Sequence, residues 1–146
     1  MQPSGPTTAE SPSPQAIMEL ASAFMRSRAF LTACELDLFT AVGRGERTSA
    51  EVAAALGTDP RGTDRLMNVL CSLGLLQKMT DGYRNTAAAD RFLVQGAPEH
   101  IEGLMHWVHL WETWSTLTAA VRAGGSVVDR PIHGRGSRSQ DRDEGL

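Results

Sequence analysis

The 146-residue sequence has few cysteines, few aromatic residues and no long apolar run. Cys34 and Cys71 lie within apolar helical patterns and have no ligand-spaced partners, so each is expected to be a small buried side chain in a reducing compartment. No apolar run approaches the roughly 20 residues of a membrane span, and the N-terminus lacks a charged-then-apolar signal pattern. We therefore expect a cytoplasmic protein with no membrane contact. The net charge of −3 provides no overall field that would attract nucleic acid.

The ends of the chain differ in composition from its middle. Residues 1–14 contain four prolines among serine, threonine and glycine, which is typical of a disordered arm. Residues 126–146 are rich in charge, glycine and serine, and are expected to form a polar, disordered tail. The sequence therefore predicts one folded domain, over residues 15–125, which is long enough to bury a core.

The most informative stretch runs from residue 48 to residue 86, and its first part predicts a short helix. Thr48 and Glu51 have the spacing of a capping box, in which each side chain accepts a hydrogen bond from the other residue's backbone N–H. Apolar residues follow with helical spacing over 50–56, and Gly57 provides the left-handed residue that commonly ends a helix.

The second part predicts another helix and a β-hairpin. Asp59-Pro60 is a typical helix start and Gly74 a typical helix end, while Asp81-Gly82 is a hairpin turn between extended runs at 75–79 and 83–86. The sequence thus predicts a mainly α fold: a winged helix-turn-helix with a small β-hairpin wing, flanked by long N-terminal and C-terminal helices. The expected buried stripe of the second helix consists of Leu66, Val69, Leu70 and Leu73.

The N-terminal flanking helix is predicted over 17–42 and is apolar around most of its circumference. One small domain can cover only one side of such a helix, so we expect a second copy of the chain to cover the other and to make a homodimer. The alternative is a helix that is buried within a compact monomer. The residues expected at the dimer interface are Ile17, Leu20, Phe24 and Met25.

The C-terminal flanking helix is predicted from Pro98 to Ala123. Trp107, Trp111 and Trp114 follow one another at helical spacing, which favours burial in a core or interface over a ligand-binding wall.

On a continuous helix, Glu102, His106 and His109 would share a face, as metal ligands can. No other element supplies the further ligands that a metal needs. A polar pocket lining or a solvated face is therefore favoured, and no metal site is predicted.

A winged helix also suggests DNA binding, for which the second helix offers a few basic and amide side chains. These are opposed by nearby acids, so few phosphates would be neutralised and no nucleic-acid partner is expected. The groups concerned are Arg61, Arg65 and Asn68, opposed by Asp59 and Asp64.

Several segments together resemble the N-terminal dimerisation domain of S-adenosylmethionine-dependent O-methyltransferases, the plant phenolic and bacterial polyketide-tailoring type. They are AFMRSRAFLTACELDLF at 23–39, TSAEVAAALG at 48–57, RLMNVLCSLGLL at 65–76, Gly82-Tyr83 and WETWS at 111–115. The resemblance covers about residues 15–129. It implies a winged-helix domain that exchanges its first helices with a partner to form an intertwined dimer of an enzyme of secondary metabolism.

The resemblance also implies where the chemistry of such enzymes lies. In that family a following Rossmann-like domain binds S-adenosylmethionine and carries the histidine that acts as base. No strand, glycine-rich turn and helix follow residue 129 here, so the chain is expected to hold no catalytic residue and no cofactor and to be inactive alone. It is expected to be a truncated form, either from an interrupted gene or by trimming of the chain. By resemblance, Met105 and His106 would line the acceptor pocket and Ser22 would reach the partner's pocket, with a small-molecule acceptor bound only in the full enzyme.

The leading hypothesis is therefore a dimerising and acceptor-pocket-shaping domain that contacts a methyltransferase catalytic domain. A winged-helix transcription regulator is the alternative from another class. A third hypothesis is an accessory subunit that completes a separate catalytic chain.

Overall fold

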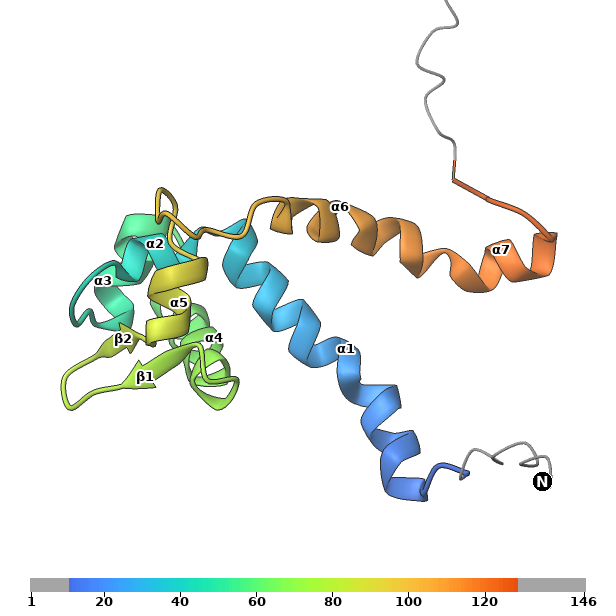
Figure 1. Cartoon of the computed structure of the whole chain (residues 1–146), viewed down its shortest axis with the longest axis horizontal. Helices are drawn as coiled ribbons and strands as arrows, with labels where there is room; N and C mark the ends of the chain where they lie inside the picture. The colour runs from blue at the N-terminus through green and yellow to red at the C-terminus, as the bar shows by residue number, and fades with distance from the viewer. Residues whose placement is uncertain (1–10, 129–146) are drawn as a thin grey trace, which may run out of the picture. The chain divides into compact units, whose positions relative to one another are not determined.

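The computed structural model describes residues 11–128 (Figure 1). The chain divides into two compact units, the first ending at Val108 and the second beginning at His109. Each unit is described by itself. Within residues 11–128, no helix combines the length and the apolar character needed to cross a membrane.

The N-terminal flanking helix is two helices rather than one. Helix α1 spans Pro14–Glu35 and α2 spans Leu38–Val42, so the continuous helix predicted over 17–42 is wrong at one point. The break is at Asp37, whose φ of 56° lies in the left-handed region that an α-helix cannot contain. Ser13 caps α1 by accepting a hydrogen bond from the backbone N–H of Ala16.

The predicted helix-turn-helix is confirmed. Helix α3 spans Ser49–Leu56 and α4 spans Pro60–Ser72, and the two pack against each other. The capping box before α3 is complete: the Thr48 backbone N–H donates to Glu51 Oε2 at 2.8 Å, and the Glu51 backbone N–H donates to Thr48 Oγ1 at 3.1 Å. Asp59 caps α4 by accepting from the Gly62 backbone N–H at 2.7 Å.

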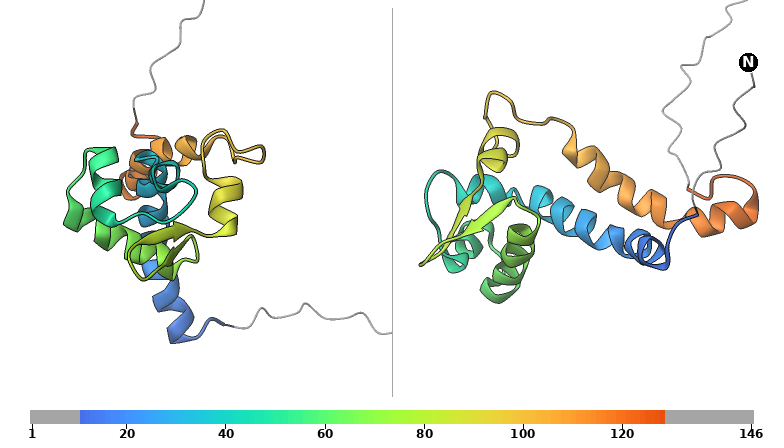
Figure 2. Two further views of the ribbon diagram at one scale, coloured as in Figure 1. Left: turned by 90° about the vertical axis from the view of Figure 1, so that its left-hand side faces the viewer. Right: turned by 60° about the horizontal axis from the view of Figure 1, so that its bottom comes forward.

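The wing is a two-stranded antiparallel hairpin. Strand β1 spans Leu76–Lys78 and β2 spans Tyr83–Asn85, so each strand is shorter than predicted, and Lys78 pairs with Tyr83. Arg47 extends the pairing beyond the hairpin, because its N–H donates to the Tyr83 carbonyl at 2.9 Å and its carbonyl accepts from the Tyr83 N–H at 2.7 Å. A Cβ at Gly82 would lie 2.5 Å from the Arg47 carbonyl oxygen, so glycine is what permits this close approach. Figure 2 shows the hairpin beside α4, with which β1 packs.

The C-terminal part differs most from the sequence prediction. A helix that was not predicted, α5 (Ala87–Phe92), follows the hairpin. The helix predicted from Pro98 is wrong at its start, since turns occupy the residues before α6 (Leu104–Ser115), and Gly103 has a φ of 81°. It is also interrupted at Thr116, after which α7 (Leu117–Ala123) begins.

The core of the first unit gathers apolar side chains from α1, α2, α3, α4, the hairpin and α5. The α4 stripe is rotated from the one predicted: Val69 is exposed, while Thr63, Met67 and Leu70 are buried and Leu66 and Leu73 are half-buried. The reason is that α4 places i, i+4 and i+7 positions starting at Thr63 toward α3 and β1. The fully buried large side chains are Leu38, Phe39, Val42, Val52, Met67 and Leu70.

Candidate dimer interface and small-molecule cavity

The N-terminal half of α1 extends away from the rest of its own unit (Figure 1), and most of its large apolar side chains are exposed. Only the C-terminal half packs on the core, where Phe30 lies 6.5 Å from Phe39 between ring centroids. The four side chains predicted at the dimer interface are all exposed in the single chain. The exposed fractions are 54% for Ile17, 79% for Leu20, and 57% for both Phe24 and Met25.

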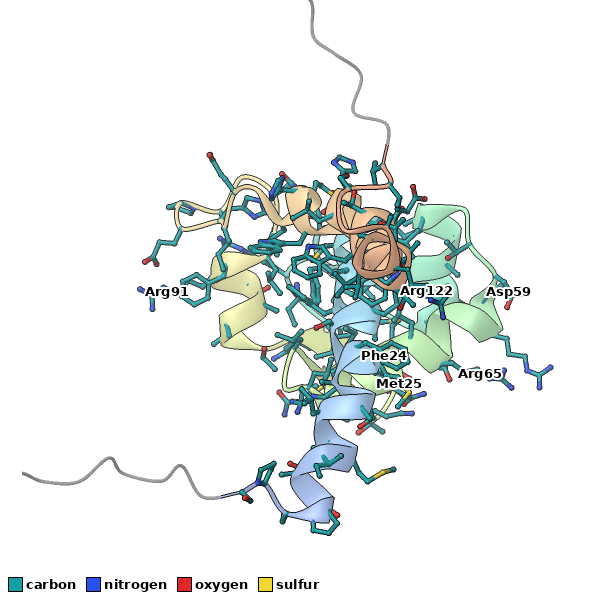
Figure 3. All side chains as sticks on the ribbon, turned by 90° about the vertical axis from the view of Figure 1, so that its right-hand side faces the viewer. Phe24, Met25, Asp59, Arg65, Arg91 and Arg122 are labelled. Carbon is teal, nitrogen blue, oxygen red and sulfur yellow. The ribbon has the colours of Figure 1, made fainter. Side chains whose placement is uncertain are left out.

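The distribution of polar side chains around α1 shows how wide this surface is. Between residues 15 and 26 the polar positions are Gln15, Glu19, Ser22 and Arg26, spaced i, i+4, i+7 and i+11. With 3.6 residues per turn, these four form one narrow strip. The rest of the circumference is apolar, and Figure 3 shows Phe24 and Met25 projecting from it. We call this apolar part of residues 16–25 the α1 outer face.

The three residues assigned by resemblance to an acceptor pocket lie in two places. Ser22 is half-buried on α1, and its hydroxyl donates to the Met18 carbonyl of its own helix at 3.0 Å. Met105 and His106 are exposed in the first turn of α6, where the His106 ring contacts Trp107 edge-on, with 5.9 Å between centroids. Of the three, only Met105 lines the cavity described next.

A cavity of about 300 Å³ opens between the α1–α2 corner and the turns that join α5 to α6. Its volume is at the lower end of the range of about 300–1,000 Å³ found for small-molecule sites. The lining combines apolar side chains with residues that carry carboxylates, an amide, an imidazole and a thiol. The lining residues are Cys34, Asp37, Phe39, Leu93, Gln95, His100, Ile101, Glu102, Gly103, Leu104 and Met105.

Hydrogen bonds fix the position of one polar edge of this cavity. The Thr40 hydroxyl donates to Asp37 Oδ1 at 2.6 Å and accepts from the backbone N–H of Gln95 at 3.0 Å. Asp37 is therefore tied to the segment after α5. Burial, reinforced by the negative charge of Asp37, raises the pKa of Cys34 to about 11, so this thiol stays protonated and is a poor nucleophile at neutral pH.

The three side chains considered as metal ligands do not lie on one helix. Glu102 lies in the turn before α6, while His106 and His109 are within it, so the three side chains do not share a helical face. Across residues 11–128, no three His, Cys, Asp or Glu side chains are grouped so that they could hold a metal ion.

The groups weighed for DNA reading are partly engaged within the protein. The Asn68 side-chain amide donates to the Asp64 carbonyl and carboxylate, and its oxygen accepts from Lys78 Nζ at 2.9 Å. The Tyr83 hydroxyl also donates to Asp64 at 2.7 Å, and this bond is the main reason that the pKa of Asp64 is lowered. Arg65 projects outward from α4 (Figure 3). The α4 face thus presents one amide whose donors and acceptor are already used.

The sequence did not reveal the cavity, because its walls come from segments about 60 residues apart that only the fold brings together. Two lining residues are singled out by the sequence: Met105 by resemblance, and Glu102 in the group for which a polar pocket lining or a solvated face is favoured. A weak signal existed in Asp37, since aspartate tolerates the left-handed conformation that turns a chain sharply, but nothing indicated that residues 93–103 would lie beside it.

The comparisons with known proteins agree with this architecture. The family model for the O-methyltransferase dimerisation domain matches residues 18–95, which include most of the α1 outer face and the complete winged helix. The chain belongs to this family. Its structure is similar to the crystal structure of human N-acetylserotonin methyltransferase in complex with S-adenosylmethionine, with a TM-score of 0.65. The two are 29% identical in sequence, and the match covers 80% of this chain and 37% of that one.

Two curated bacterial relatives show the same coverage. The dimerisation domain is 38% identical to the tetracenomycin polyketide synthesis 8-O-methyl transferase of Streptomyces glaucescens, over 79% of this chain and 35% of the relative. It is 31% identical to the 3-hydroxy-5-methyl-1-naphthoate 3-O-methyltransferase of Streptomyces sahachiroi, over 91% of this chain and 41% of the relative. The chain therefore spans about a third to two fifths of the length of these relatives.

Proposed function

We propose that this chain is the part of a small-molecule O-methyltransferase that joins two copies into a homodimer and shapes the acceptor side of the active site. The observation that carries the proposal is the α1 outer face, which leaves Ile17, Leu20, Phe24 and Met25 exposed in a domain whose family is defined by dimerisation. An apolar surface of this width is rarely left in water by a stable monomer. A second copy would cover it in an isologous interface.

Several parts of the proposal depend on a catalytic domain. Residues 11–128 contain a single sheet, the two-stranded hairpin, and hence no strand, glycine-rich turn and helix that could hold a nucleotide-like methyl donor. We infer that this chain alone binds no S-adenosylmethionine and transfers no methyl group. Ser22, Met105 and His106 would contact the acceptor once a catalytic domain is present, with Ser22 reaching across the dimer.

The remaining parts of the proposal concern the environment of the protein. The half-buried free thiols of Cys34 and Cys71 support a reducing, cytoplasmic location. The self-engaged amide of Asn68 and the net negative charge support small-molecule metabolism over DNA binding.

Light scattering and calorimetry on the full chain test the two main statements separately. Over a wide concentration range we expect a particle of twice the 15.7 kDa chain mass. A monomer at all concentrations would contradict the dimer. Titration with S-adenosylmethionine should release no heat, and micromolar binding would show that the donor site is not confined to a catalytic domain.

A further inference from the structure

The cavity between the α1–α2 corner and the α5–α6 turns has a chemical character that neither dimerisation nor the family assignment explains. We infer that it binds a small organic cation, an ammonium group on an aromatic or alkyl body, with the charge at Asp37 and Glu102 and the body against the apolar lining residues. This inference does not depend on the proposed dimer, since every lining residue belongs to the first unit of one chain.

The charge of the ligand is inferred from the residues that line the cavity. Asp37 and Glu102 line the cavity, and none of the described residues that line it is a lysine or an arginine. Asp37 uses Oδ1 to accept from Thr40, and within residues 11–128 no hydrogen bond reaches its Oδ2 or the carboxylate of Glu102. Both carboxylates can therefore accept from a ligand, and an anionic ligand would be repelled.

The polar groups beside the carboxylates also favour a hydrogen-bond donor. His100 lines the cavity, and its Nδ1 is buried with no hydrogen-bond partner in the described part of the chain. A buried polar nitrogen without a partner is uncommon in native proteins, and a neutral imidazole nitrogen of this kind is an acceptor for a ligand N–H.

The apolar lining residues determine the body of the ligand. Leu93, Ile101, Leu104 and Met105 are apolar residues of the cavity lining, and the volume of about 300 Å³ accommodates a single ring with a short side chain. A cavity with apolar walls and a few convergent polar groups is the usual form of a small-molecule site. The backbone around it is fixed, because the Ile101 N–H donates to the Phe92 carbonyl at 2.9 Å.

Three probes of nearly equal shape test the assignment on the full chain: benzylamine, benzyl alcohol and benzoate. The readout is the NMR chemical shift of the Leu93, Leu104 and Met105 methyl groups during each titration. We expect benzylamine to bind at least tenfold more tightly than benzoate, with benzyl alcohol between them, and added salt to weaken only benzylamine. Equal affinities, a preference for benzoate, or no shift of these methyl groups would overturn the inference.

Substitutions then locate the charge. Asn tolerates the left-handed backbone of Asp37 and can still accept from Thr40, so Asp37→Asn should fold. Combined with Glu102→Gln, it should lower the affinity for benzylamine at least fivefold and leave that for benzyl alcohol unchanged. Glu112→Gln removes an exposed carboxylate of α6 outside the lining and is the matched control. Unchanged benzylamine binding in the double variant, or an equal loss in the control, would refute the assignment.

Discussion

Phe24→Asp is the substitution that bears most on the proposed dimer. The Phe24 side chain is 57% exposed in one chain, so a dimer can remove roughly half of its surface from water. Full burial of a phenylalanine is worth about 1.5–3 kcal/mol, which leaves about 1–2 kcal/mol per copy and about 2–4 kcal/mol for the symmetric pair. An aspartate would also bring an unpaired charge into the interface.

The expected result is a large loss of affinity between copies without loss of the fold. The total destabilisation should be about 4 kcal/mol or more, which corresponds to roughly a thousandfold weaker dimer. Phe24 lies on the half of α1 that does not pack on the core, so the far-UV circular dichroism and thermal midpoint of the dilute monomer should be unchanged. Sedimentation velocity over a concentration series measures the dissociation constant.

Arg26→Gln provides the matched control. It lowers the net charge by the same one unit and lies on the polar strip of α1, so it should change the dissociation constant by less than about threefold. The reasoning is refuted if Phe24→Asp dimerises as tightly as the wild type, or if Arg26→Gln is as disruptive as Phe24→Asp.

Three substitutions test the winged helix itself. Gly82→Ala should force the hairpin away from Arg47 and break the two backbone hydrogen bonds between Arg47 and Tyr83. The free energy of unfolding, measured by denaturant titration, should fall by about 1–3 kcal/mol, and an unchanged midpoint would contradict this. Thr48→Ala removes the side-chain acceptor of the capping box and should cost about 1 kcal/mol in the same assay, whereas Thr48→Ser should cost little. Tyr83→Phe should cost about 1 kcal/mol and raise the pKa of Asp64 toward its ordinary value, measured by carboxyl NMR. Because the pKa of Asp64 is lowered in the folded state, this carboxylate stabilises the fold above its unfolded pKa of about 3.9, and the stabilisation is lost as pH falls through the folded pKa. The Tyr83→Phe variant should therefore lose less stability on acidification than the wild type. Identical profiles of stability against pH would contradict this.

The winged helix was predictable because each of its boundaries has a local chemical cause. The capping box at Thr48, the Asp59-Pro60 start and the Asp81-Gly82 turn all depend on residues within a few positions of one another. Such signals operate before tertiary packing is decided, and the structure places all three where the sequence did.

The errors arose where tertiary structure decides the local conformation. Apolar spacing continues through Asp37, so periodicity alone gave one long helix, and only the turn of the chain onto the core reveals the break. The early start predicted at Pro98 failed similarly, because the pattern carried no sign that Gly103 adopts a positive φ. Val69 was misplaced because α4 rotates its stripe to fit α3 and β1.

For the candidate sites, the sequence indicated the exposed apolar residues of the α1 outer face but not the cavity. The width of the α1 outer face can be counted from the order of polar and apolar residues, and no contact needs to be known. The cavity depends on Asp37 lying beside residues 93–105, which is a long-range property of the fold.

Photo-crosslinking from position 20 tests the central claim most directly, namely that a second copy covers the α1 outer face. Leu20, at 79% exposure, is replaced by a benzophenone amino acid, and isotopically light and heavy chains are mixed and irradiated while dilute. We predict a covalent product of twice the 15.7 kDa chain mass that joins light to heavy chains, and far less of it when the same group replaces Arg26. Recovery of monomer alone from position 20, or equal yields from the two positions, would contradict the account.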